Sequence, residues 1–364
     1  MTKQVSVAID FTILSNFLCV TEYREKEKQK CFPFPVSFTI GQYKVVVPLY
    51  NTVLADDDEI IYPDVDILIG VNDKGLNTNY RNKCKQKILR TVYRKTDQVA
   101  LLTEAAKTLN IKNYYVFNAC NSEKYVPSDQ RFVLIKPELA AEGLDHFILD
   151  TTKIDPITFI NTLKRFSKDE EFIEYLTINK DAVSHYSGLG LEPKEEAVGI
   201  LKNATHARAF SSFTRVGTVS FSIQEIVQDI KKEYRVILDK DKKPVFIVPR
   251  LRKANQHPLL KTSIVDYKQG YGEELLTEDE TRLDVDIAEV FNTQADIDDF
   301  NKLVQSSFFE PVSSIDLFVC EDGRWGIFEF NPQFGLKVYP LPFKFKLHMN
   351  YIKDVVAKYL RLKV

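Results

Sequence analysis

The residues with the clearest chemical potential lie near the C-terminal end, in the stretch IDLFVCEDGRWGIFEFNPQFG. Asp316, Glu329 and Asn331 are polar residues set among Ile, Leu, Phe and Val. Burying a carboxylate is costly unless a positive partner compensates it, and carboxylate and amide oxygens suit Mg²⁺. We therefore interpret these three residues as candidate metal ligands. The alternative is an exposed edge hairpin whose acids are only solvated.

The same stretch is predicted to form a β-hairpin. Two β-rich runs, Ser314–Cys320 and Trp325–Asn331, flank an Asp-Gly pair, which is the strongest short-range hairpin signal. If Asp322 and Gly323 form a two-residue loop, counting outward gives three opposed pairs: Phe318 with Ile327, Asp316 with Glu329, and Ser314 with Asn331. Opposed side chains share a face and lie about 5 Å apart, so a cation is expected between the two carboxylates.

Two further segments could bind a nucleotide. Lys136 ends the apolar run FVLIKP before the small-residue turn ELAAEG, where an ammonium could reach phosphate oxygens; a surface lysine at a strand end is the alternative. The polar pair Gln224 and Glu225 interrupts another apolar run. Main-chain groups next to Ile226 and Val227 could therefore bond an adenine edge.

The elements that must position these residues suggest three domains. Residues 1–94 contain the strand-like runs QVSVAID, YKVVVPLY and VDILIGV, followed by the basic segment YRNKCKQKILRTVYRK, which is expected to be helical with a solvated charged face. An anion-binding surface is the alternative interpretation of that segment. We expect an α/β N-terminal domain.

Residues 95–224 are predicted as a central subdomain with the helix TDQVALLTEAAKTLN and the strands NYYVFNA, RFVLIKP and HFIL. A helical insertion is expected at about 151–215, with Asp155-Pro156 as one helix start and Glu192-Pro193 as a second. Residues 225–364 form the predicted C-terminal subdomain, which holds the hairpin and a terminal core-packing helix.

The composition is that of a globular chain with small-molecule partners. The 364 residues carry a formal net charge of −2, which gives no global electrostatic case for nucleic acid or an anionic membrane. No apolar run reaches the roughly 18 residues that a membrane span needs, and no signal peptide is recognised, so a cytoplasmic location is expected. Five cysteines without CxxC spacing indicate neither a disulfide framework nor a zinc site. A homodimer is left open.

Taken in order, these residues resemble the ATP-grasp superfamily, and within it carboxylate-amine ligases such as D-alanine–D-alanine ligase and the ribosomal-protein glutamate ligases. The resemblance implies an α/β fold with α+β sandwich layers, in which ATP lies between two sheets. It also implies roles for the following residues: Lys95 and Lys136 at the phosphates, Gln224 and Glu225 to Val227 at the adenine, Glu233 at the ribose, Asp316, Glu329 and Asn331 at Mg²⁺ or Mn²⁺, and Gly335 in a glycine turn.

The implied activity is that of an ATP-dependent ligase that forms a carbon–nitrogen bond. A substrate carboxylate would attack the γ-phosphate of ATP to give an acylphosphate and ADP, and an amine would then displace phosphate. Two departures from the family stand out: the loop ELAAEG offers only Gly143, and Ser314 replaces the arginine that some ligases have before the metal-binding Asp. Arg250 and Arg252 are candidates for stabilising the transition state in place of that arginine. Because arginine can bind a carboxylate through two hydrogen bonds, Arg235, Arg250 and Arg252 are also candidates for binding the acceptor carboxylate.

Two other functions fit the same pattern. Inositol-phosphate kinases share this architecture and a similar metal set, so a small-molecule kinase is one alternative. A regulatory protein that binds ATP without turning it over is the other, and the glycine-poor loop favours it.

Overall fold

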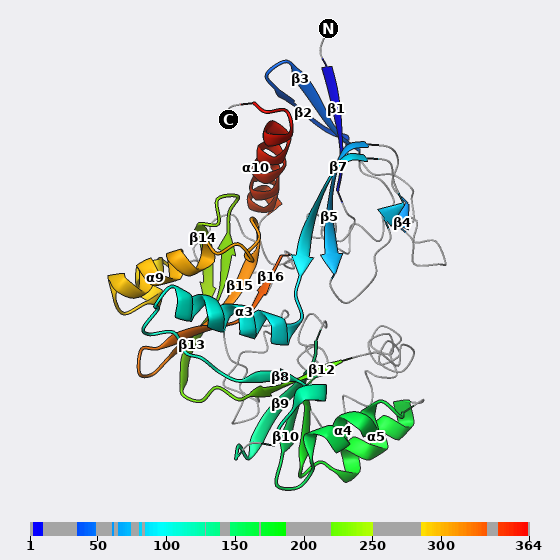
Figure 1. Ribbon diagram of the computed structural model, residues 1–364, viewed down its shortest axis with the longest axis vertical. Helices are drawn as coiled ribbons and strands as arrows, with labels where there is room; N and C mark the ends of the chain where they lie inside the picture. Colours follow the sequence, from blue (N-terminus) through cyan, green and yellow to red (C-terminus); the bar gives the residue numbers. More distant parts are fainter. Residues whose placement is uncertain are drawn as a thin grey trace.

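A computed structural model describes the chain at the following residues: 3–9, 35–48, 60–61, 65–73, 80–81, 84–127, 129–138, 146–166, 169–186, 220–249, 285–332 and 341–362. Within them, sheets and helices combine in an α/β architecture, which is the predicted fold class (Figure 1). The domain boundaries at residues 94 and 224 stay predictions.

The N-terminal part forms a five-stranded sheet in the order β2-β3-β1-β5-β7. Its strands are β1 (Lys3–Ile9), β2 (Pro35–Ile40), β3 (Tyr43–Pro48), β5 (Val65–Asp73) and β7 (Cys84–Val92). Only β2 pairs antiparallel, against β3, and the other pairs in the sheet are parallel. A separate short parallel pair is made by β4 (Ile60–Ile61) and β6 (Tyr80–Arg81).

Strand β7 shows that the helix expected in the basic segment was wrong. Most of the segment forms β7, which pairs in parallel with β5, and the two lysines of the strand, Lys85 and Lys87, are exposed. Pairing with a neighbouring strand decides the conformation here, because strand preference depends on context more than on composition. Arg90 of the same strand is buried, donates to the carbonyls of Pro311 and Val312, and lies 5.5 Å from the centre of the Tyr351 ring. Arg90 thus ties the N-terminal sheet to the C-terminal part of the chain.

The central sheet is antiparallel, in the order β11-β10-β9-β12-β8. Its strands are β8 (Ala119–Asn121), β9 (Phe132–Pro137), β10 (His146–Asp150), β11 (Val183–Tyr186) and β12 (Phe221–Glu225), with a single 3-10 turn, η1 (Ser122–Lys124), after β8. The strands predicted in RFVLIKP and HFIL are confirmed, whereas the strand in NYYVFNA is limited to its end, at β8.

The section after β10 begins with the predicted helix start. Asp155 caps α4 (Pro156–Leu163), since its carboxylate accepts a hydrogen bond of 2.8 Å from the Thr158 N–H. Pro156 occupies the first turn, where its missing N–H costs nothing. Helix α5 (Asp169–Ile178) follows, and both helices pack on the central sheet.

The sequence suggested that this whole section is helical, but part of it is a strand. β11 is a strand that extends the central sheet beside β10, so its apolar residues serve the sheet rather than a helix. The second helix start, at Glu192-Pro193, lies outside the described residues.

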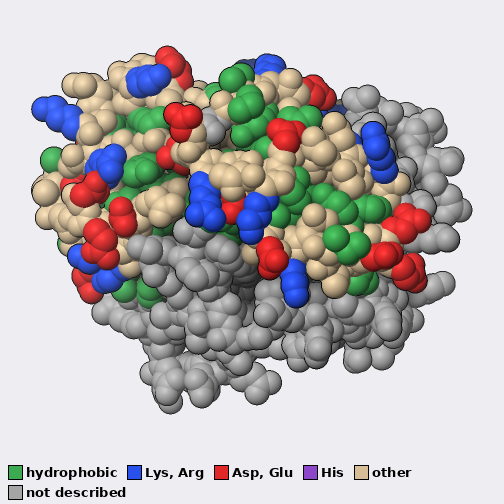
Figure 2. Space-filling model, turned by 90° about the horizontal axis from the view of Figure 1, so that it is seen from below, with side chains coloured by type: hydrophobic (Ala, Val, Ile, Leu, Met, Phe, Trp, Pro, Cys, Tyr) green, Lys and Arg blue, Asp and Glu red, His purple; other side chains and the backbone are tan. Residues whose placement is uncertain are grey.

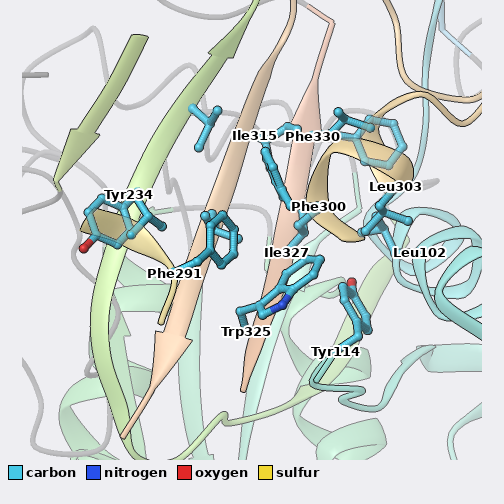
Figure 3. Close-up of a cluster of buried hydrophobic side chains, with 14 of the residues drawn as sticks. Leu102, Tyr114, Tyr234, Phe291, Phe300, Leu303, Ile315, Trp325, Ile327 and Phe330 are labelled. Atoms are coloured by element: carbon cyan, nitrogen blue, oxygen red, sulfur yellow. The ribbon is translucent and has the colours of Figure 1, made fainter. Parts of the chain in front are cut away.

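The C-terminal sheet is antiparallel in the order β14-β13-β15-β16. Its strands are β13 (Ile230–Leu238), β14 (Pro244–Pro249), β15 (Ser314–Cys320) and β16 (Trp325–Asn331), and the helices α8 (Ile287–Val290) and α9 (Gln294–Val304) come between β14 and β15. A large apolar cluster packs on one face of this sheet (Figure 3). Trp325 lies at the centre of the cluster and is only 1% exposed. Its ring centroid lies 5.3 to 5.9 Å from those of Tyr114, Phe291 and Phe300.

Helix α3 (Lys95–Thr108) lies between the C-terminal and central sheets (Figure 1). Leu102 enters the cluster of Trp325, while Val99 packs with Phe318 on the opposite face of the hairpin. The Gln98 side chain accepts a 2.8 Å hydrogen bond from the Phe330 N–H. These contacts fix the first turn of α3 against β16, so that Lys95 is held near the end of the hairpin.

Helix α10 (Leu341–Tyr359) is the predicted terminal helix. Leu347, Tyr351, Ile352 and Val355 are buried in a cluster that also contains residues of the N-terminal sheet and of β13 and β14, so the expected core-packing role is confirmed. Within the described residues, none of the helices combines the length and the apolar character needed to cross a membrane.

The surface in Figure 2 carries basic and acidic side chains interspersed with apolar ones. Neither sign of charge dominates the described part of this face. The view is in keeping with the near-neutral formal net charge of −2.

Candidate functional site

The hairpin places Asp316 opposite Glu329 and Ser314 opposite Asn331, as predicted. The third predicted pair was wrong, because Phe318 lies opposite Gly326 rather than Ile327. Two local features produce this combination.

The first feature is the loop, which has three residues instead of two. The Gly323 N–H donates to the Cys320 carbonyl at 3.0 Å, and the Cys320 N–H donates to the Arg324 carbonyl at 2.7 Å. Gly323 has φ of 86°, the left-handed conformation that closes a three-residue hairpin loop. The longer loop shifts the pairing by one residue.

The second feature is a β-bulge that shifts the pairing back. The register changes between Asp316 and Leu317, so that Phe328 is the extra residue on β16. A bulge lets two adjacent side chains on one strand lie on the same face. Phe328 accordingly packs on Phe318, with ring centroids 4.3 Å apart, while Glu329 still faces Asp316.

The hairpin therefore has two distinct faces. One is covered by the cluster of Trp325 and is apolar. The other, which we call the site face, carries the following side chains: Glu233, Arg235, Asp316, Phe318, Phe328, Glu329 and Asn331. Close packing fixes this face, because a Cβ on Gly326 would lie 2.5 Å from the Phe318 ring.

Arg235 engages Asp316 directly. The two residues lie opposite each other on β13 and β15, and Nε and Nη2 of Arg235 donate to the two carboxylate oxygens at 2.9 and 3.0 Å. Both side chains are largely buried, at 13% and 7% exposure. Arg235 was a candidate for binding a substrate carboxylate, but in this structure its guanidinium holds a carboxylate of the protein itself.

Glu329 has weaker partners and more exposure. Its Oε2 lies 3.8 Å from Nζ of Lys95, and its Oε1 accepts a 3.0 Å hydrogen bond from Asn331. Burial raises the pKa of the Glu329 carboxyl, but Lys95, the hydrogen bond from Asn331, Lys136 and Arg235 outweigh burial, and the pKa lies well below 4.5. Glu329 is therefore ionised at neutral pH.

Lys136 reaches the site face from the central sheet. Its Nζ lies 5.9 Å from the centre of the Phe328 ring, and its charge interacts with Glu329, Glu233 and Asp316. Burial lowers the pKa of the Lys136 ammonium from 10.5 to about 8, against the opposing effect of Glu329. The predicted neighbourhood of Lys95, Lys136 and the paired carboxylates is thus present. The sequence led us to expect a metal cation between the paired carboxylates. In the structure, lysine and arginine side chains supply part of that positive charge.

The predicted adenine segment lies where β12 ends. Gln224 is buried in the sheet, and Ile226 and Val227 directly after the strand are buried as well. The Glu225 carboxylate accepts hydrogen bonds from the main-chain and side-chain N–H groups of Asn118, at 3.0 and 3.2 Å. One oxygen of this carboxylate, Oε2, is therefore hydrogen-bonded to the neighbouring segment.

Glu138 is a site residue that the sequence did not single out. It is 2% exposed, and its carboxylate accepts from the Thr96 N–H, the Thr96 hydroxyl and the Asn121 amide, at 3.1, 2.6 and 3.3 Å. Its carbonyl accepts from the Lys95 N–H at 3.2 Å. Glu138 thus caps α3 and joins the residue after Lys95 to the end of β9, two positions beyond Lys136. Its position directly after KP was the available signal.

Several predicted site residues lie outside the described residues. They are Arg250, Arg252, Gly335 and the loop after Glu138.

The site fits one oxygen-preferring divalent cation better than it fits two. Glu329 and Asn331 offer a carboxylate and an amide, which are donors that Mg²⁺ accepts. Asp316 also carries oxygen donors, but Arg235 already bonds to both of them. The described residues contain no group of three or more His, Cys, Asp or Glu side chains arranged to hold a metal, so amide, water and phosphate oxygens would have to complete a shell.

Comparisons with known proteins give structural similarities only. No family model matches the sequence, and no curated protein matches it. D-alanine–D-alanine ligase from Bacillus anthracis, solved with ATP, is 8% identical, with 97% of this chain and 99% of that chain covered and a TM-score of 0.37. D-alanyl-alanine synthetase A from Vibrio cholerae is 10% identical, with 98% of each chain covered and a TM-score of 0.40.

A third similar structure is the C-terminal domain of Pby1 from K. lactis, an ATP-grasp enzyme. It is 11% identical, with 99% of this chain and 95% of that chain covered and a TM-score of 0.33. The TM-scores are low, so the function proposed below is argued from the residues of the site.

Proposed function

We propose that this chain is a Mg²⁺-dependent and ATP-dependent carboxylate-amine ligase that forms an amide or peptide-like bond. The observation that carries the proposal is the convergence of Lys95 and Lys136, from two different elements, on the site face beside Glu329. Two ammonium groups can bind phosphate oxygens, and a carboxylate and an amide can bind a divalent ion, so the site suits a nucleoside triphosphate with a bound divalent ion. The proposed ATP position is between the central and C-terminal sheets.

In the proposed mechanism the chain supplies position and charge. Lys95 and Lys136 neutralise phosphate oxygens, while Ile226 and Val227 accommodate the adenine through main-chain groups and Glu233 binds the ribose. Glu329 and Asn331 would hold Mg²⁺, which supplies positive charge to the transferred phosphoryl group. Positioning and electrostatics of this kind need no nucleophilic side chain.

The proposed reaction has two steps. A substrate carboxylate oxygen attacks the γ-phosphorus, the bond to the β,γ-bridging oxygen breaks, and ADP leaves. An amine nitrogen then attacks the acyl carbon, phosphate leaves, and the nitrogen loses a proton. Arg250 and Arg252 are the proposed partners of the acceptor carboxylate, and we place the reaction in the cytoplasm.

The test is release of ADP by wild type and by Glu329→Gln, with a pool of amino acids and small carboxylates. Substrate-stimulated release by wild type alone, with free phosphate and an amide product, is expected. Equal release by both proteins would reject the role of Glu329. A phosphorylated product without free phosphate would instead indicate a small-molecule kinase.

The Arg235–Asp316 ion pair favours a second candidate function, an ATP-binding regulatory protein without turnover. Arg235 engages both oxygens of a carboxylate that the resemblance assigns to metal binding. ATP binding by wild type with no ADP release under any substrate pool would support this second function.

A further inference from the structure

The carboxylates of the site face are engaged to very different degrees. The Asp316 side chain is 7% exposed and accepts two hydrogen bonds, of 2.9 and 3.0 Å, from one guanidinium. The Glu329 side chain is 27% exposed, and its lysine partner lies at 3.8 Å. A planar bidentate pair is stronger and more directional than a contact with an ammonium. Glu329 is thus the carboxylate that an incoming cation can reach.

The position of Arg235 makes its pairing with Asp316 hard to undo. Arg235 is on an inner strand, with Val248 of β14 on one side and Asp316 of β15 on the other. If a metal ion displaced the guanidinium from Asp316, a largely buried positive charge would lose its partner, which is a costly rearrangement. The pair should therefore persist when a nucleotide binds.

Apart from Glu138, whose carboxylate accepts hydrogen bonds from Thr96 and Asn121, the charged side chains on and beside the site face balance one another. Three cationic side chains face three carboxylates among the described residues: Lys95, Lys136 and Arg235, with Glu233, Asp316 and Glu329. A nucleoside triphosphate would bring its own negative charge, so the choice between one ion and two depends on the available ligands: a second divalent ion would have to compete with Arg235 for the oxygens of Asp316. One divalent ion at Glu329 needs no such exchange.

We propose that Arg235 takes the place of a second divalent cation, so that the chain binds one divalent ion per nucleotide, at Glu329 and Asn331, with Asp316 serving as the partner of Arg235. This inference rests on the proposed nucleotide site. Asp316 is then a positioning residue, which holds the guanidinium of Arg235, rather than a metal ligand. Arg235 supplies the positive charge that a second ion would otherwise supply beside Asp316.

The experiment counts bound Mn²⁺ by electron paramagnetic resonance, with the protein saturated by a non-hydrolysable ATP analogue. Wild type should bind one ion per chain. Arg235→Gln should bind two, because Asp316 then joins Glu329 as a paired carboxylate. The double variant Arg235→Gln/Asp316→Asn should return to one, since it replaces the ion pair with two neutral side chains and removes the carboxylate that a second ion would need.

A matched control is Arg131→Gln, which removes another Arg–Asp pair, to Asp150, in the central sheet. It should keep one ion. Two ions in wild type, one in Arg235→Gln, or none in the double variant would each overturn the inference. Failure of wild type to bind the nucleotide at all would overturn the proposed function itself, and is recognised separately by calorimetric titration with the analogue.

Discussion

Lys95 Nζ and Glu329 Oε2 lie 3.8 Å apart, which brings the first residue of α3 to the second strand of the hairpin. The pKa of Glu329 lies below 4.5 because this lysine, with Asn331, Lys136 and Arg235, outweighs the effect of burial. A depressed folded-state pKa means that the ionised carboxylate stabilises the folded chain above about pH 4.5. The contribution is lost as the pH falls through the folded-state pKa.

Glu329→Gln should therefore lower the free energy of unfolding at neutral pH, by about 1 kcal/mol because the pair is partly exposed. The difference from wild type should shrink as the pH falls below about 4. Urea denaturation at several pH values measures it, and Glu104→Gln, at an exposed position on α3, is the control. A difference between Glu329→Gln and wild type that does not change with pH would contradict the electrostatic origin.

Nucleotide binding should weaken at alkaline pH because of Lys136. Burial lowers the pKa of its ammonium to about 8, and phosphate oxygens bind the protonated form. The affinity should be constant at lower pH and should fall by up to about tenfold per pH unit above about pH 8, as the free protein loses this proton. Calorimetric titration with a non-hydrolysable ATP analogue checks the profile.

The control for this profile is Lys136→Arg, whose guanidinium stays charged throughout the range. Its nucleotide affinity should vary less with pH than that of wild type, even if its affinity at neutral pH is lower. The same alkaline fall in both proteins would assign the titration to another group.

The sequence predicted those parts of the site that depend on local pattern. Strand alternation and the Asp-Gly signal located the hairpin and put Asp316 opposite Glu329, although the pairing agrees only because two errors of register offset each other. The length of the loop and the bulge at Phe328 were missed because the Asp-Gly signal locates a turn without fixing how many residues it contains. The two errors cancel at the carboxylates and remain visible at Phe318.

Contacts between distant segments were beyond the sequence. The bond between Arg235 and Asp316 depends on β13 pairing with β15, 81 positions apart, and no local pattern encodes that register. The role of Glu138 likewise depends on α3, which begins 43 positions earlier in the chain (138 minus 95). The segment of β7 was predicted as a helix from its basic composition. Its pairing with β5, which the local sequence does not reveal, decides its conformation instead.

Gly326→Ala should disturb the site face through packing. The new Cβ would lie 2.5 Å from Cζ of Phe318 and 3.0 Å from the Tyr115 carbonyl. Overpacking of a core typically costs about 1–3 kcal/mol, and thermal unfolding should show a loss in this range. Phe318→Leu should recover part of the loss when it is combined with Gly326→Ala. If the losses simply add in the double variant, the contact with Phe318 is not the cause.

Glu138→Ala should weaken nucleotide binding as well as the fold. Glu138 is the carboxylate that caps α3 through Thr96, and it fixes the residue after Lys95 to the end of β9, close to Lys136. Loss of a helix cap costs about 0.5–2 kcal/mol of stability. Loss of the Glu138 cap should also let Lys95 and Lys136 move relative to each other. The two ammonium groups would then be less well positioned to bind the phosphates.

Asp155→Ala provides the matched control. Asp155 caps α4 through the Thr158 N–H at 2.8 Å, and α4 packs on the central sheet among residues that do not belong to the site face. Both variants should lower the free energy of unfolding by similar amounts in urea, but only Glu138→Ala should raise the dissociation constant of the ATP analogue, by several-fold or more. Equal dissociation constants for the two variants would show that Glu138 stabilises the fold without positioning the lysines. Glu138→Gln then separates charge from geometry: it keeps one carbonyl acceptor for Thr96, and should restore most of the nucleotide affinity if the connection between α3 and β9 is what matters.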